Sequence, residues 1–104
     1  MKIIIAGAGA VGGHLAKLLS RENHDITLID DDPTRLRSLE NSYDLSVLEG
    51  SATSLTILRN AGVDEADLFV GVTKNESQNL NACILAHELG EKKTVARIDS
   101  EDLM

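Results

Sequence analysis

A glycine-rich segment, Gly7-Ala8-Gly9-Ala10-Val11-Gly12, constrains the fold of this 104-residue chain more than any other feature. It directly follows the apolar run Lys2–Ala6, which has the length of a β-strand, and it opens a segment with apolar residues at helical spacing. Alone, a G-x-G-x-x-G segment is a weak signal, because glycines are also common in flexible turns. Between a strand and a helix it predicts a phosphate-binding turn. There, Gly7 permits the tight turn, Gly9 admits a pyrophosphate and Gly12 lets the helix pack closely.

The start of this helix and the end of the next apolar run complete the predicted nucleotide site. A helix N-terminus offers unpaired N–H groups and partial positive charge, so we expect Ala10 and Val11 to donate backbone hydrogen bonds to phosphates. Asp30 ends the second apolar run, 18 residues after Gly12, where an acidic side chain can accept hydrogen bonds from ribose hydroxyls. The alternative is that Asp30 only caps the turn into the second helix. Asp31 is a weaker candidate beside it, for which solvent exposure is equally expected.

Charge around Asp30 favours particular nucleotides. Asp30, Asp31 and Asp32 would repel a 2′-phosphate, so the sequence favours NAD(H), or an adenine nucleotide such as ATP or ADP, over NADP(H). Arg35 follows within the second helix. It could lean over the adenine or reach a phosphate, although solvated helix surface is the commoner position for such a residue.

Apolar runs of strand length alternate with helical patterns along the whole chain. Most are continuous, which indicates strands buried on both faces. This alternation predicts an α/β fold, a Rossmann-like doubly wound parallel sheet of about five strands in the order 3-2-1-4-5, with its switch point between strands 1 and 4. We expect residues 1–104 to form one nucleotide-binding domain, truncated relative to a six-stranded sheet. The runs are Lys2–Ala6, Asp25–Asp30, Leu45–Leu48, Leu68–Thr73 and Thr94–Ile98.

Capping residues predict where the second and third helices begin and end. Asp32 is a plausible N-cap, and Pro33 suits the first position of the second helix. Ser51 or Thr53 is expected to cap the third helix, and Gly62 to end it.

Composition excludes several classes of function. The net charge of -7 argues against nucleic-acid binding, which needs a basic surface, and Tyr43 and Phe69 are the only aromatic residues. One cysteine, Cys83, gives neither a disulfide nor a metal cluster, and the three histidines lack zinc-site spacing. The glycine turn lacks the Lys-Ser/Thr of a nucleotide-hydrolysing loop, and no catalytic triad order is present. Because no catalytic constellation is present, we expect a protein that is not an enzyme. No apolar run approaches a membrane span, so we expect it to be cytoplasmic.

Further candidate ligand contacts lie at the ends of the third and fourth runs. Ser51 and Ala52 are expected near the adenine, with capping of the third helix as the alternative for Ser51. Thr73, Lys74 and Asn79 follow the fourth run, across the switch point from the glycines, where they could contact a nicotinamide ribose or a terminal phosphate. For Lys74, an ordinary surface position is the safer interpretation.

These strand ends also carry a family resemblance. The segments Gly50-Ser51-Ala52-Thr53, Thr73–Asn79 and Ala96-Arg97, together with the glycine turn and Asp30, resemble the N-terminal domain of the Trk potassium-uptake regulators. The chain is similar to the wider RCK/KTN group over essentially its whole length. One position departs, because the family often has Asp where this sequence has Ser51.

The resemblance implies a regulatory function. Such domains bind NAD(H) or ADP/ATP, form homodimers and higher homo-oligomers, and lie on the inner face of the cell membrane against a potassium-translocating subunit. Ligand-dependent rearrangement then adjusts ion flux. Arg97 is expected to pair with a carboxylate or, as its place in the family pattern implies, with a nucleotide phosphate at a dimer interface. The alternative from another class is the cofactor-binding domain of an NAD-dependent oxidoreductase.

Overall fold

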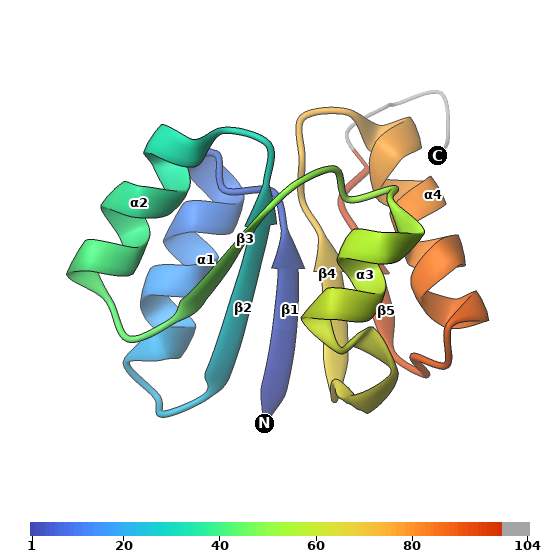
Figure 1. Cartoon of the computed structure of the whole chain (residues 1–104), viewed down its shortest axis with the longest axis horizontal. Helices are drawn as coiled ribbons and strands as arrows, with labels where there is room; N and C mark the ends of the chain where they lie inside the picture. The colour runs from blue at the N-terminus through green and yellow to red at the C-terminus, as the bar shows by residue number, and fades with distance from the viewer. Residues whose placement is uncertain (99–104) are drawn as a thin grey trace.

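One parallel sheet organises the molecule, whose computed structural model describes residues 1–98. Its strand order is β3-β2-β1-β4-β5, which confirms the predicted order and puts the switch point between β1 and β4 (Figure 1). The strands β1 and β2 pair in parallel, from Lys2 opposite Asp25 to Ala6 opposite Ile29. The strands are β1 (Lys2–Ala6), β2 (Asp25–Asp30), β3 (Ser46–Glu49), β4 (Leu68–Gly71) and β5 (Thr94–Ala96).

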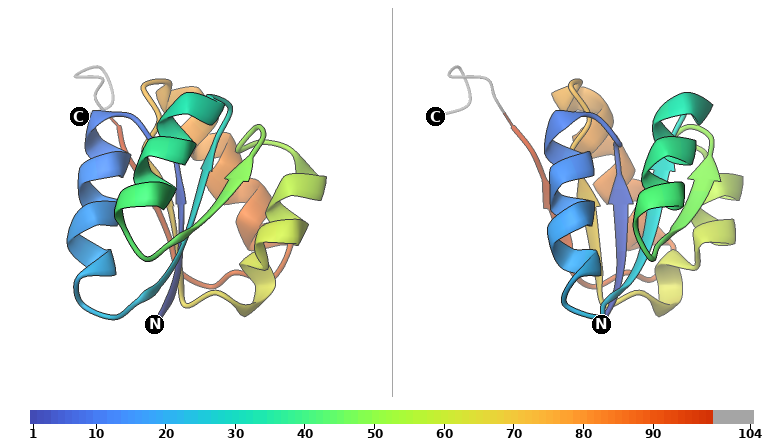
Figure 2. Two further views of the ribbon diagram at one scale, coloured as in Figure 1. Left: turned by 60° about the vertical axis from the view of Figure 1, so that its left-hand side comes forward. Right: turned by 90° about the vertical axis from the view of Figure 1, so that its left-hand side faces the viewer.

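Helices cover both faces of this sheet. Figure 2 shows α1 and α2 in front of the sheet, while α4 lies behind it. None of the helices within residues 1–98 has the length and apolar character needed to cross a membrane. The helices are α1 (Ala10–Ser20), α2 (Pro33–Ser42), α3 (Leu55–Ala61) and α4 (Glu76–Glu88), with a short 3₁₀ turn, η1 (Val63–Glu65), after α3.

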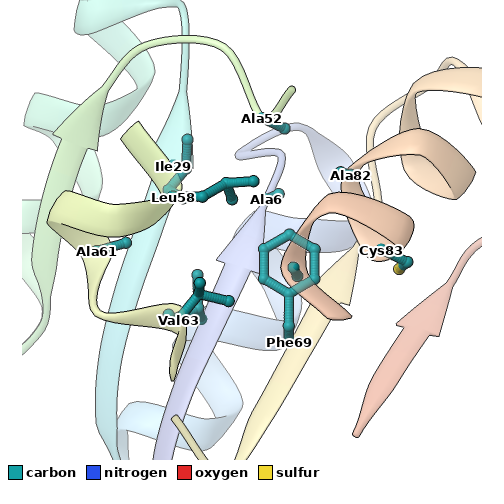
Figure 3. Packing of buried hydrophobic residues seen from close by; sticks show 11 residues of the cluster. Ala6, Ile29, Ala52, Leu58, Ala61, Val63, Phe69, Ala82 and Cys83 are labelled. Carbon is teal, nitrogen blue, oxygen red and sulfur yellow. The ribbon is translucent and has the colours of Figure 1, made fainter. Parts of the chain in front are cut away.

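The two faces hold separate hydrophobic cores. Along β1, Ile3 and Ile5 point toward α1 and α2, whereas Ile4 and Ala6 point toward α3 and α4. All four side chains are buried, as expected for a central parallel strand covered on both faces. Figure 3 shows the second core, in which Phe69 of β4 packs among side chains from β1, α3 and α4.

The termini of three strands differ from the predicted ones. The third strand is shifted by one residue, and the fourth and fifth end at Gly71 and Ala96, two residues before the apolar runs end. Val72 is still buried, and its N–H donates to Ala6 O (2.9 Å). The Thr73 N–H instead donates to the side-chain oxygen of Asn79 (2.8 Å). The apolar run therefore marks burial beyond the point where β4 stops pairing with β5.

Helix caps confirm two predictions and correct a third. Asp32 caps α2 by accepting hydrogen bonds from the backbone N–H groups of Thr34 and Arg35, and Gly62 ends α3 with a φ of 78°. The cap of α3 is Ser54, whose hydroxyl accepts from Ile57 N–H (3.3 Å), and not Ser51 or Thr53. These last two side chains bond to each other in the preceding turn (2.9 Å).

Candidate functional site

A cavity of about 250 Å³ opens at the carboxyl ends of the strands, beside the switch point. Parallel α/β sheets bind ligands at this position because the strand order reverses there and the loops diverge. Four lining residues, Gly50, Gln78 and the apolar Ile29 and Val72, are not among the predicted contacts. Gly50 and Gln78 lie within the motif segments at the strand ends, whereas no motif marks Ile29 or Val72. Nine predicted site residues line the cavity: Gly7, Gly9, Ala10, Val11, Asp30, Asp31, Ala52, Thr73 and Arg97.

The three motif glycines have different surroundings. Gly7 has a φ of +116°, and a Cβ there would lie 2.9 Å from Thr73 N, so only glycine fits the turn. A Cβ on Gly12 would lie 1.6 Å from Gly7 O, which shows how closely α1 packs on the turn. A Cβ on Gly9 would approach only the Arg35 guanidinium, at 3.9 Å. Gly9 therefore leaves open space at the cavity, whereas Gly12 is buried and does not line it.

The N-terminus of α1 is left without a side-chain cap. Its N-cap is Gly9, and the Gly13 N–H donates to Gly9 O (2.8 Å). By contrast, Asp32, Ser54 and Asn75 cap the other three α-helices with their side chains. The first turn of a helix has N–H groups with no intrahelical acceptor, and at α1 these groups and the positive end of the helix dipole lie at the cavity.

Asp30 connects the glycine turn to α2. Its Oδ1 accepts the N–H of Ala8 (3.0 Å), and its Oδ2 accepts the N–H of Asp32 (3.0 Å). The side chain is half-buried and lines the cavity. A carboxylate has about four lone-pair sites, so both oxygens can still accept hydrogen bonds from a ligand. A structural role and a ligand-binding role for Asp30 are therefore compatible.

Charges of both signs line the cavity. Asp30 and Asp31 lie at the end of β2, and Lys74 and Arg97 lie beyond the ends of β4 and β5. Asp32 does not line the cavity. Its carboxylate caps α2 and pairs with the half-exposed Arg35 (Nε to Oδ2, 3.5 Å). Arg35 itself lines the cavity, so it can reach a ligand there. The acidic cluster expected from sequence thus presents two of its three carboxylates to this space.

Two other predicted contacts lie outside the cavity lining. Ser51 is exposed, and its hydroxyl accepts the N–H of Thr53 (3.2 Å). Asn79 is buried, with a side chain that hydrogen-bonds to Thr73 and Arg97. Arg97, expected within a strand, follows the end of β5 and is half-buried at the cavity.

Groups suited to other chemistry are dispersed. Among residues 1–98, no group of three or more His, Cys, Asp and Glu side chains could hold a metal ion. Cys83 is buried, and its thiol lies 3.5 Å from Val95 O. Burial raises the pKa of the Cys83 thiol, which disfavours the thiolate that a nucleophilic cysteine needs.

Solved structures of nucleotide-bound proteins share this fold. The Kef CTD of Shewanella denitrificans in its AMP-bound form has a TM-score of 0.76 and 27% identity, covering 91% of this chain and 58% of that one. The GsuK channel bound to NAD has a TM-score of 0.77 and 23% identity, covering 90% of this chain and 18% of that one. The second likeness shows the fold alone.

Sequence relatives extend over the whole chain. The Trk system potassium uptake protein TrkA of Vibrio alginolyticus is 46% identical over 105 residues, which covers 100% of this chain and 23% of that protein. The chain thus spans about a quarter of the length of this relative. The sequence model of the TrkA-N domain matches residues 3–104. The chain belongs to the TrkA-N domain family.

Proposed function

We propose that this chain is the nucleotide-sensing domain of a potassium uptake system. The observation that carries the proposal is the open space at Gly9, bounded by the uncapped start of α1 and by the Asp30 carboxylate. Backbone without a Cβ, free N–H groups and a ribose acceptor are the three parts of a dinucleotide or adenine nucleotide site. The potassium uptake role rests on family membership and on the name of the Vibrio relative.

The lining suggests how a nucleotide would lie. Phosphates would approach Gly9 and the first turn of α1, the adenosine ribose would bond to Asp30, and the adenine would lie near Ala52. The part of the ligand beyond the first phosphate would extend toward Thr73 and Arg97. Ser51 and Asn79 take no direct part in this arrangement.

Charge selects among the candidate ligands. A 2′-phosphate on the ribose would meet Asp30 and Asp31, so NAD(H), ATP and ADP are favoured over NADP(H). The AMP of the Kef CTD structure and the NAD of the GsuK structure both lack this phosphate.

A regulatory function is favoured over the oxidoreductase alternative by family membership and by the name of the Vibrio relative. Hydride transfer to a carbonyl substrate needs a positioned acid–base group at the nicotinamide. Within residues 1–98, the cavity lining offers Asp30, Asp31 and Lys74 as titratable groups of this kind, and no histidine, cysteine or tyrosine. Regulation needs only that a nucleotide bind two conformational or assembly states with different affinity. We propose that these states belong to a homo-oligomer on the cytoplasmic side of a membrane potassium-translocating subunit.

Calorimetric titration of the chain with NADH, NADPH, ATP and ADP tests the proposed ligand class. We expect NADH, ATP or ADP to bind at least about tenfold more tightly than NADPH. The 2′-phosphate of NADPH would lie beside a carboxylate, and a repulsion of about 1.4 kcal/mol weakens binding tenfold. Tightest binding of NADPH would overturn the assignment of the ribose site to Asp30 and Asp31. Absence of binding by all four ligands would overturn the proposed function.

A further inference from the structure

We infer that Asn79 is a positioning residue, which holds Thr73 and Arg97 as one unit and so prepares the site for the part of a nucleotide beyond its first phosphate. The inference rests on the proposed function. It also reassigns Asn79, which the sequence predicts as a direct ligand contact. The evidence comes from its hydrogen bonds, from its place between two strand ends, and from the position of its partners at the cavity.

The side-chain amide of Asn79 is fully engaged. Its Oδ1 accepts the N–H of Thr73 (2.8 Å) and the Thr73 hydroxyl (2.7 Å). Its Nδ2 donates to Thr73 O (3.0 Å) and to Arg97 O (3.0 Å). Only this orientation of the amide suits one N–H donor and two carbonyl acceptors. With 1% of its surface exposed, Asn79 is inaccessible to a ligand, yet its partners are not.

These bonds lie where the ladder between β4 and β5 ends. The last backbone bond of the pair runs from Arg97 N–H to Gly71 O (2.8 Å). Beyond it, the Asn79 amide links the segments that follow β4 and β5. The N–H and the C=O of Arg97 are therefore both hydrogen-bonded, although β5 ends at Ala96. Figure 1 shows α4 beginning beside the carboxyl ends of these strands.

Gly71 permits the close approach of α4 that this link requires. A Cβ on Gly71 would lie 3.2 Å from Asn79 O and 3.3 Å from Asn79 Cα. Such contacts are tighter than ordinary van der Waals packing, so a side chain at this position would displace the helix. Glycine in β4 and asparagine in α4 therefore act together.

The partners of Asn79 form one side of the cavity. Thr73 and Arg97 line it from two neighbouring strand ends, opposite the side that carries Asp30. A short nucleotide such as AMP needs Asp30 and the glycine turn. A longer one, such as ATP, also needs Thr73 and Arg97 at a fixed separation, because loosely held groups lose entropy on binding.

The test compares AMP and ATP affinities in the 104-residue chain and two variants. Asn79→Ser removes the amide without adding charge. Ala86→Gly, in the same helix and fully buried, lowers stability without touching this network. We expect Asn79→Ser to weaken ATP binding at least about tenfold and AMP binding less than about threefold, and Ala86→Gly to leave the ratio unchanged. Conformational stability alone does not move this ratio.

Different outcomes separate the inference from the proposed function. If the wild-type chain binds neither nucleotide, the proposed function fails. If it binds both and Asn79→Ser keeps the wild-type ratio, or Ala86→Gly changes the ratio equally, the inference fails.

A second measurement needs no variant. Native-state hydrogen exchange should give the Thr73 and Arg97 amides the same opening free energy, since one side chain holds both segments. An Arg97 amide that exchanges as a frayed strand end, while the Thr73 amide stays protected, would contradict the inference.

Discussion

At the scale of single residues, Gly9 and Gly12 belong to one motif but have opposite surroundings. Gly12→Ala would place a Cβ 1.6 Å from Gly7 O, so α1 must move away from the turn. We expect this variant to lose about 2 kcal/mol or more of unfolding free energy, the usual cost of overpacking. Denaturant unfolding measures that loss, and wild-type stability in Gly12→Ala would contradict the close packing of α1 on the turn.

Gly9→Ala is the matched variant. Its Cβ meets only the mobile end of Arg35, and the backbone there has an ordinary φ of -73°. We expect less than about 1 kcal/mol of destabilisation, set by the poor N-cap preference of alanine. Because the added methyl enters the space proposed for phosphate, nucleotide affinity should fall at least about tenfold. Calorimetric titration of the folded variant measures this affinity. An unchanged affinity would contradict the assignment of Gly9 to the ligand site.

Asp30 and Asp31 give a second pair of matched variants. Asp30→Asn replaces one acceptor oxygen by an NH₂ group that faces a backbone N–H. This change should lower the free energy of unfolding by about 1–3 kcal/mol and weaken the binding of every ribose-bearing ligand. Asp31→Asn should leave stability unchanged and narrow the preference for NADH over NADPH. Parallel unfolding and binding measurements separate the two residues. If Asp30→Asn loses stability but no affinity, Asp30 is only structural.

The sequence predicts Gly7, Gly9 and Asp30 at the cavity because a motif with a known mechanism specifies them. It predicts Asn79 as a direct ligand contact, whereas the structure buries this side chain and bonds it to Thr73 and Arg97. The pattern shows that an asparagine follows β4, but its burial depends on α4 approaching β4 over Gly71, a tertiary contact with no local signal.

At the scale of elements, the start of α3 is the part least determined by sequence. Three hydroxyl residues, Ser51, Thr53 and Ser54, occur within four positions, and each could serve as an N-cap. The structure selects Ser54, and the first two close a separate turn. Strand ends are uncertain for a related reason, since hydrophobicity reports burial and does not report which partner accepts each N–H.

Ser54→Ala tests the assigned cap. We expect a loss of about 1 kcal/mol of unfolding free energy, because the Ile57 N–H loses its acceptor. Ser51→Ala, which removes an exposed turn hydroxyl, should change stability by less than about 0.5 kcal/mol. Denaturant unfolding of both variants is the measurement. The reverse order of the two effects would mean that Ser51 caps the helix after all.

At the scale of the whole molecule, the alternation of strands and helices, together with the glycine turn after the first strand, predicts the topology. Right-handed crossovers put α1 and α2 on one face, and α3 and α4 on the other, so β1 and β4 become neighbours with diverging loops. That divergence creates the cavity beside the glycine turn. The fold itself is shared with proteins of other functions, so the proposal of potassium regulation rests on family membership and not on the fold.

Two-dimensional amide NMR during titration with ATP and with NADH tests the central claim most directly. If the cavity is the nucleotide site, the largest shifts will occur at Gly9, Ala10 and Val11, with further shifts at Asp30 and Thr73. In Gly9→Ala, the same shifts will need at least about tenfold more ligand. Largest shifts at the opposite end of the sheet, around the hollow lined by Asp64, Asp67 and Glu91, or no shifts with millimolar ligand, would contradict the account.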